Sequence, residues 1–183
     1  MSKIWNKHKE IRYTIYAIAV IVGTGMIVYL HGYRLNWHTN SSPYGVYRCV
    51  TTGELGREMY VCVDTTALLV HPDIKEAHKR EYFGHKLFSR SPRDLLKQIG
   101  GVPGDVIDVV SSRLMINGVI QKNGIILSVD SQGQPLPRLP FPYVIPEGEY
   151  WLYSDHERGF DSRYFGSVPL KYIKSKMVPI LQW

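Results

Sequence analysis

A long uncharged stretch near the N-terminus constrains this chain more than any other feature. Residues Tyr13–Leu30 contain no Asp, Glu, Lys or Arg. At about 1.5 Å per residue, a helix of this length spans roughly 27 Å, close to the ~30 Å hydrocarbon core of a bilayer. Tyr13, Tyr16 and Tyr29 lie near its ends, where amphipathic rings favour the membrane interface. We therefore expect residues 13–31 to form a transmembrane anchor.

A cleaved signal peptide is the alternative for this stretch. Signal peptides usually have an apolar region of about 7–15 residues, followed by a small-x-small cleavage site. The uncharged run is longer than that, and His31-Gly32-Tyr33-Arg34 offers no such site. The sequence favours an uncleaved anchor.

The charge distribution predicts the topology and excludes one class of partner. Residues 1–12 carry Lys3, Lys7, Lys9 and Arg12 against Glu10. The basic flank of a membrane helix stays on the cytoplasmic side. We therefore expect residues 1–12 to be a cytoplasmic tail of a single-pass inner-membrane protein, with the domain after the anchor in the periplasm. The tail holds +3 of the net +6, and the other +3 is spread over the rest of the chain. We therefore expect the lipid bilayer as a partner and no nucleic acid.

The chain beyond the anchor is rich in short strand-like segments. A polar linker (36–40) precedes them, and Gly, Pro, Asn and Asp punctuate them. The expected strands are Val46–Val50, Met59–Val63, Val106–Val110, Leu114–Ile116, Ile125–Val129, Glu149–Tyr153 and Met177–Leu181. This pattern predicts a mostly β fold of short antiparallel strands, sandwich-like or partly closed. Pro72-Asp73 opens a short helix over 74–83, and the proline-rich segment 131–146 is expected to be a wrapping loop.

The two cysteines lie in two of these expected strands. Tyr47–Val50 and Tyr60–Val63 are joined by a polar loop with Gly53 and Gly56, which predicts a hairpin. Such a hairpin would bring Cys49 and Cys62 opposite each other. A disulfide in an oxidising compartment and two buried thiols both remain open.

The sequence predicts no cofactor and no metal. His71, His78 and His85 recur every seven residues. Two helical turns separate such residues by about 10 Å, too far for one ion. We expect solvated histidines on a surface helix.

Three segments contain residues whose chemistry is not core filling. In Ser41-Ser42-Pro43-Tyr44-Gly45, Pro43 fixes φ and Gly45 relaxes the chain, so that a serine is held on a shaped turn. Lys97 follows two leucines and precedes Ile99. Its stem can snorkel, but a buried amine would lose its proton more easily and act as a base.

The third segment runs from Asp155 to Gly166 and combines three acids, two arginines and a serine between apolar strands. Such groups must face water at a turn or pair with one another. A plain salt bridge between Asp161 and Arg163 at a turn is the alternative to a supporting role in a site.

In order and spacing, the three segments resemble the boxes of type I signal peptidases. The boxes are Ser41-x-Pro43-x-Gly45-x-Tyr47, Lys97-x-Ile99-x-Gly101-x-Pro103-Gly104-Asp105 and Asp161-Ser162-Arg163-Tyr164-Phe165-Gly166. The Ser-x-Pro-x-Gly spacing is more similar to the TraF-type branch, membrane-anchored serine peptidases of conjugative transfer. Asp130-Ser131-x-Gly133-x-Pro135 also looks like that branch. Ser154-Asp155-His156 departs from the Gly-Asp-Asn common in the housekeeping enzymes.

The resemblance implies a site without histidine. It implies that Ser41 is the nucleophile, with Ser42 as a less favoured alternative, and that Lys97 is the general base. The backbone N–H of Ser41 and the Thr39 hydroxyl would form the oxyanion hole. Asp161, Arg163 and Ser162 would support the lysine.

The resemblance also implies a periplasmic peptidase domain over 36–183, with 66–94 as a family-specific insertion. The expected function is processing of a pilin precursor or other exported protein of a conjugative transfer system, with hydrolysis and cyclisation both open. Other proteins of the conjugation apparatus are expected as further partners. The alternatives are a general signal peptidase, a catalytically silent assembly subunit and an autoproteolytic repressor-type domain. The anchor and the scattered charge argue against the repressor-type domain.

Overall fold

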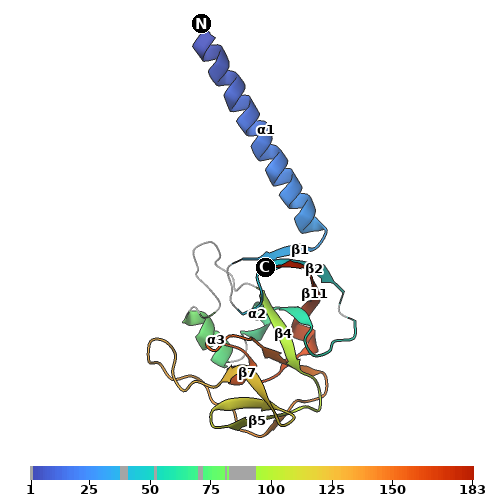
Figure 1. Ribbon diagram of the computed structural model, residues 1–183, viewed down its shortest axis with the longest axis vertical. Helices are drawn as coiled ribbons and strands as arrows, with labels where there is room; N and C mark the ends of the chain where they lie inside the picture. The colour runs from blue at the N-terminus through green and yellow to red at the C-terminus, as the bar shows by residue number, and fades with distance from the viewer. Residues whose placement is uncertain (1, 38–40, 52, 70–71, 81, 83–93) are drawn as a thin grey trace. The chain divides into compact units, whose positions relative to one another are not determined.

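The computed structural model describes residues 2–37, 41–51, 53–69, 72–80, 82 and 94–183. It divides into two compact units, Met1–Arg34 and Leu35–Trp183. The first unit is built on helix α1 (Ser2–Leu30), which contains no proline and ends just before Gly32, a residue with φ of 81°. Its segment His8–Leu30 is long and apolar enough to cross a membrane (Figure 1).

The second unit is mostly β, which confirms the predicted fold class (Figure 1). Seven strands form a sheet in the order β1-β2-β11-β3-β4-β9-β10, and four form a smaller sheet in the order β7-β6-β5-β8. The larger sheet consists of β1 (Tyr33–Asn36), β2 (Gly45–Val50), β11 (Ile173–Gln182), β3 (Tyr60–Val63), β4 (Leu95–Gly101), β9 (Glu149–Tyr153) and β10 (Val168–Pro169). The smaller sheet consists of β7 (Val119–Ile125), β6 (Arg113–Ile116), β5 (Val106–Val110) and β8 (Tyr143–Val144).

Among the described residues, four short helical segments accompany the two sheets. They are α2 (Thr65–Leu68), α3 (Pro72–Lys79), α4 (Ser162–Phe165) and the 3₁₀ turn η2 (Leu170–Tyr172). Helix α3 begins two residues before the expected start and stops before the expected end. Its last turn is held by Glu76, which pairs with Lys79 and Arg80.

The hairpin predicted around the cysteines is wrong. Strands β2 and β3 do not pair, because the C-terminal strand β11 lies between them. Met177 of β11 is the register partner of both Cys49 and Tyr60. Neither cysteine forms a disulfide within the part of the chain that the structure describes, and the Cys49 Sγ donates to Met177 Sδ at 3.3 Å. Strand β11, from the far end of the chain, pairs with both β2 and β3, and local sequence spacing carries no sign of it.

One expected strand is displaced. The segment Ile125–Val129 was expected to be extended, but β7 runs over Val119–Ile125 and pairs with β6. The Asn117-Gly118 turn between them has positive φ at both residues, 49° and 79°. That geometry matches a tight hairpin turn, so the strand starts at once after it. The proline-rich segment 131–146, expected to be a wrapping loop, is irregular over most of its length, but Tyr143–Val144 form strand β8 and pair with β5.

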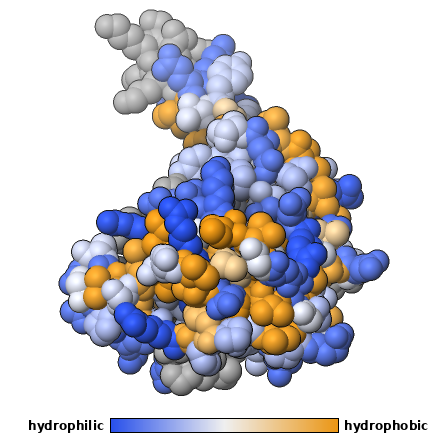
Figure 2. All heavy atoms as spheres, turned by 60° about the horizontal axis from the view of Figure 1, so that its bottom comes forward, coloured by the Kyte–Doolittle hydropathy of each residue, from blue (hydrophilic) through white to orange (hydrophobic). Residues whose placement is uncertain are grey.

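Two apolar cores hold the unit together. One lies against the larger sheet and includes Val61, Ile99 and Leu152, and the other joins Ile107 and Leu114 of the smaller sheet to Trp151. Figure 2 brings β5 and β7 of Figure 1 forward and shows apolar side chains gathered on that face. The exposed apolar residues of these strands are Val106, Val110, Val119 and Ile120.

Candidate active site

The serine turn is fixed by side chains from neighbouring strands. The Asn36 amide, buried at the end of β1, donates to the carbonyls of Ser42 and Pro43, both at 3.0 Å. The hydroxyl of Tyr47 donates to the Pro43 carbonyl at 2.7 Å. Two carbonyls of one turn are therefore pinned from two strands, which gives the turn before β2 a defined shape.

Gly45 is required in this turn because a neighbouring backbone lies close to it, and not because of an unusual φ. A Cβ on Gly45 would lie 2.2 Å from the carbonyl oxygen of Leu181 on β11. Any side chain there would push β11 off β2 at the point where Gly45 pairs with Gln182. The Ser-x-Pro-x-Gly spacing is thus tied to sheet pairing.

The two serines of the turn differ in their surroundings. Ser42 is buried, and its hydroxyl donates to the carbonyl of Leu96 on β4 at 3.2 Å. Ser41 is half-buried and lines a pocket of about 430 Å³. The other lining residues are Ser42, Pro43, Tyr44, Tyr60, Gln98, Asp155 and Trp183. The serine turn therefore contacts β4 at Leu96 and shares a pocket with Gln98, the two residues on either side of Lys97.

Lys97 is a buried lysine in the middle of the larger sheet. It is 4% exposed, and its register partner on β3 is Val61. Burial lowers its pKa from 10.5 to about 8; the charge of Asp161 acts in the opposite direction, and that of Arg163 lowers the pKa further. At pH 7, about one unit below this pKa, about a tenth of the lysine is a neutral amine, the form that can accept a proton, and that fraction rises steeply with pH.

Asp161 and Arg163 form a buried ion pair, which is more than a salt bridge at a surface turn. Both side chains are 0% exposed, and Arg163 Nη2 lies 2.8 Å from Asp161 Oδ2. Burial lowers the pKa of Arg163, but the charge and hydrogen bond of Asp161 outweigh burial and leave it above its ordinary value. Breaking such a pair from one side costs about 3–5 kcal/mol, because the remaining charge is buried without compensation.

The guanidinium and the carboxylate also bind the backbone around them. Arg163 donates to the carbonyls of Asn123, Ile125, His156 and Gly159 at 2.9–3.1 Å. Asp161 accepts from the N–H of Ser154 at 3.0 Å and from the N–H of Arg163 at 3.1 Å, which makes it the N-cap of α4. Ser162 is buried, and its hydroxyl accepts from the N–H of Leu152 on β9 at 2.8 Å. The supporting residues thus join β7, β9 and α4.

Asp105 is a structural residue of the Lys97 segment. Its carboxylate accepts from the N–H of Val102 at 2.8 Å and from the amide of Asn117 at 2.8 Å, and it pairs with Arg57. Gly104 before it has φ of 84°, a conformation that favours glycine. These contacts close the turn between β4 and β5 and hold the end of the strand that contains Lys97.

The structure brings some of the expected site residues together. The serine turn adjoins β4 through the Ser42–Leu96 hydrogen bond, and Asp161 with Arg163 acts electrostatically on Lys97. Lys97 itself does not line the pocket that contains Ser41. Thr39, His71 and His85 lie outside the described residues, and so does the side chain of His78.

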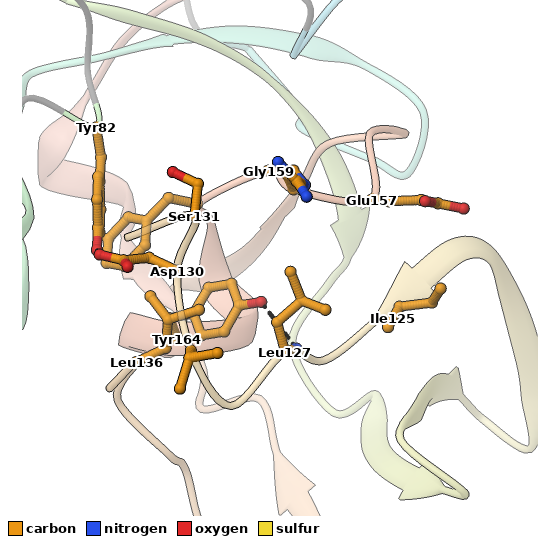
Figure 3. Close-up of a pocket in the computed structure, with 12 residues that line it drawn as sticks. Tyr82, Ile125, Leu127, Asp130, Ser131, Leu136, Glu157, Gly159 and Tyr164 are labelled. Carbon is orange, nitrogen blue, oxygen red and sulfur yellow. Dashed lines mark hydrogen bonds between the residues drawn. The ribbon is translucent and has the colours of Figure 1, made fainter. Parts of the chain in front are cut away.

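A second, larger pocket of about 500 Å³ lies beside the Asp155–Gly166 segment (Figure 3). Figure 3 shows Tyr82 and Asp130 on one side of it, and the Tyr164 hydroxyl accepting the N–H of Leu127, at 3.1 Å. Asp130 Oδ1 accepts from the N–H groups of Gln132 and Gln134, both at 2.8 Å, and its other oxygen accepts from the Tyr82 hydroxyl. The segment after β7 is thus folded by Asp130 and linked to the segment after α3.

The sequence did not point to Asn36, Tyr82 or Ser154, although all three have a place in or beside the site. Asn36 precedes the serine turn by only a few residues, and an asparagine that follows a strand is a signal for a side chain binding turn carbonyls. Tyr82 carries no comparable local signal, since its partner Asp130 is distant in sequence, and Ser154 stands out only in a departure from the Gly-Asp-Asn pattern.

Comparisons with known proteins agree on one family. The family model described as signal peptidase, peptidase S26, matches residues 11–183. A conjugal transfer protein TraF of Agrobacterium fabrum is 29% identical over 90% of this chain and 90% of its own length. A plasmid transfer protein TraF of Escherichia coli is 29% identical over 85% of each, and a conjugal transfer protein TraF of Agrobacterium tumefaciens is 30% identical over 81% of this chain and 82% of its own length.

A solved structure adds a weaker likeness. The crystal structure of a signal peptidase I from Enterococcus faecalis superposes with a TM-score of 0.39 and 19% identity. It covers 69% of this chain and 98% of its own.

Proposed function

Because this chain belongs to the signal peptidase family, peptidase S26, and is a peptidase by that membership, we propose that it is a membrane-anchored serine endopeptidase with Ser41 as nucleophile and Lys97 as base. The single observation that carries the proposal is the burial of Lys97. A lysine that is 4% exposed with a pKa near 8 stands one residue from both Leu96, which binds the serine turn, and Gln98, which lines the Ser41 pocket. A lysine serving only solubility would be exposed.

The proposed reaction begins with proton transfer from the Ser41 hydroxyl to the neutral amine of Lys97. The serine oxygen attacks the scissile carbonyl carbon, and the backbone N–H of Ser41, with the Thr39 hydroxyl, stabilises the negative oxygen. The C–N bond then breaks, and the lysine ammonium returns its proton to the leaving amine. Water, deprotonated by the same lysine, hydrolyses the ester and regenerates Ser41.

The choice of Ser41 over Ser42 is supported by hydrogen bonding. The Ser42 hydroxyl is committed to the Leu96 carbonyl, and Ser42 is 7% exposed. Ser41 lines the pocket and is more accessible to a substrate. The Ser42 side chain then has the task of fastening the turn to β4.

We further propose that the substrate is a pilin precursor or another exported protein of a conjugative transfer system. The support is the similarity over most of the chain to proteins named for conjugal or plasmid transfer. Other proteins of that apparatus are proposed partners. We also propose that residues 13–31 anchor the chain in the inner membrane, with 1–12 cytoplasmic, 36–183 forming the periplasmic peptidase domain, and 66–94 an insertion in it.

Co-expression of the chain with a pilin precursor from the same transfer system tests this function. Ser41→Ala and Lys97→Ala should each abolish processing, and the double variant should be no worse, because the two residues act as one unit. Ser42→Ala should retain substantial processing. Mass spectrometry of the product separates hydrolysis from cyclisation, since a cyclic product is lighter by one water. An active Ser41→Ala variant would overturn the assignment.

A further inference from the structure

Ser154 carries a buried hydroxyl that makes no hydrogen bond to any residue the structure describes. The residue is 0% exposed. Its backbone, in contrast, is bound at both groups: the N–H donates to Asp161 Oδ2 at 3.0 Å, and the carbonyl accepts from Arg163 Nη2 at 3.5 Å. Burial of an unpaired hydroxyl costs about 1–3 kcal/mol. A buried, unpaired hydroxyl at a candidate active site is therefore expected to bind a partner during the reaction.

The sheet register places Ser154 beside Lys97. Strands β4 and β9 are antiparallel, with Gln98 opposite Tyr153 and Ile99 opposite Leu152. One further step puts Ser154 opposite Lys97. Directly opposed residues share a face of the sheet, and their Cβ atoms lie about 4.5–5.5 Å apart.

On the other flanking strand, the residue opposite Lys97 is apolar. The register partner of Lys97 on β3 is Val61, which is fully buried. The charged groups that act on the lysine, Asp161 and Arg163, belong to the segment that holds the backbone of Ser154. Of the two residues opposite the lysine on its flanking strands, Ser154 is thus the one with a hydroxyl.

The space behind Ser154 is closed by Gly159. A Cβ on Gly159 would lie 2.9 Å from the Cβ of Ser154 and 3.0 Å from its Oγ. Gly159 is also part of the wall of the larger pocket in Figure 3. Its close backbone approach closes one side of the hydroxyl, while the register places Lys97 of β4 on the same face of the sheet as Ser154.

We propose that Ser154 is a positioning residue for Lys97: its Oγ accepts a hydrogen bond from an N–H of the lysine amine in the enzyme–substrate complex. A neutral amine has two N–H groups and one lone pair. If one N–H is held by Ser154, the lone pair can be directed at the Ser41 hydroxyl. The inference rests on the proposed role of Lys97 as base.

A hydrogen bond from Lys97 to Ser154 would restrict the conformations of the lysine side chain. A lysine stem has four rotatable bonds and about 2 kcal/mol of rotamer entropy. Asp161 and Arg163 set the potential around the amine but do not direct its lone pair. A hydroxyl on the adjacent strand supplies that direction and stays bound when the amine becomes an ammonium.

Ser154→Ala in the full-length, detergent-solubilised protein tests the proposal, with a purified pilin precursor as substrate. The kcat should fall about tenfold or more, while KM changes less than twofold. The loss should persist at the high-pH plateau, where Lys97 is fully neutral, because misdirection of the amine does not depend on its protonation. The thermal unfolding midpoint should stay equal or rise, since the variant removes a buried unpaired hydroxyl.

Ser162→Ala is the matched control. The substitution is the same and the site is equally buried, but the Ser162 hydroxyl accepts from the N–H of Leu152. Its loss leaves that N–H unpaired, so the unfolding midpoint should fall. Opposite effects of the two variants on the midpoint would separate a positioning hydroxyl from a structural one.

Ser41→Ala and Lys97→Ala serve as references and keep the two hypotheses distinguishable. If either reference variant processes the precursor, or the wild type does not, the proposed function fails. If both are inactive and Ser154→Ala keeps the wild-type plateau, the positioning role is refuted while the proposed function stands. A fall in the Ser154→Ala midpoint as large as that of Ser162→Ala would also refute the positioning role.

Discussion

Replacing Lys97 by methionine should make the protein more stable at neutral pH. Methionine has a similar length and no charge, and it fits an apolar site without strain. The Lys97 pKa is about 8 in the folded protein and 10.5 as the reference value. A difference of about 2.5 pH units at about 1.4 kcal/mol each gives about 3 kcal/mol. This is the cost of keeping Lys97 protonated in the folded state.

Because the Lys97 pKa is lower in the folded protein than in the unfolded chain, the destabilisation by Lys97 depends on pH. Below pH 8 the lysine is charged in both states, and the folded state bears the full cost. Between pH 8 and 10.5 the folded protein has already lost the proton while the unfolded chain still binds it, so the free energy of unfolding of the wild type rises with pH. The advantage of Lys97→Met should therefore be about 3 kcal/mol at pH 7 and below about 1 kcal/mol at pH 10.

Thermal unfolding of the two full-length proteins in the same detergent measures the difference. For a chain of this size, about 3 kcal/mol corresponds to roughly 6–12 °C in the midpoint. Lys171→Met is a suitable control, because Lys171 is exposed and its replacement should change little. A Lys97→Met variant no more stable than wild type at pH 7, or an advantage independent of pH, would refute the burial argument.

Two further predictions concern the Asp161–Arg163 ion pair and the membrane topology. Asp161→Asn leaves Arg163 buried without its counter-charge, so the free energy of unfolding measured by denaturant titration should fall by about 3–5 kcal/mol; its processing activity should fall less than that of Lys97→Ala, and equal loss in both would point to proton transfer by Asp161. Protease added to spheroplasts should digest residues 36–183 and spare the N-terminal tail, because the basic flank keeps that tail inside; full protection of the domain would reverse the topology.

The residues of the candidate site stand out in the sequence where their chemistry is local. A serine between a polar linker and Pro43, a lysine among leucines, and an acid–arginine block are each unusual within a few residues. In the structure the serine turn is hydrogen-bonded to β4, which contains the lysine, and the acid–arginine block is hydrogen-bonded to β9 through Ser162. The burial of Lys97 follows from its alternation with Ile99 and Gly101 on the inner face of β4.

The parts that could not be predicted depend on pairing between distant segments. The insertion of β11 between β2 and β3 overturned the cysteine hairpin, and neither strand carries a signal of its partner. Gly45 reflects the same pairing, since its reason is the backbone of Leu181. The buried Ser154 hydroxyl is invisible in a sequence, because only the register of β4 and β9 sets it against Lys97.

The most direct test of the account is the pH–rate profile of precursor processing by the wild type and by Lys97→Arg. If Lys97 is the base, the wild-type rate should rise with a midpoint near pH 8 and then reach a plateau, because the buried Lys97 amine loses its proton over that range. Lys97→Arg should be inactive throughout, because a guanidinium keeps its proton. A wild-type midpoint near pH 6.5, typical of a histidine base, or an active Lys97→Arg variant would contradict the Ser41/Lys97 mechanism.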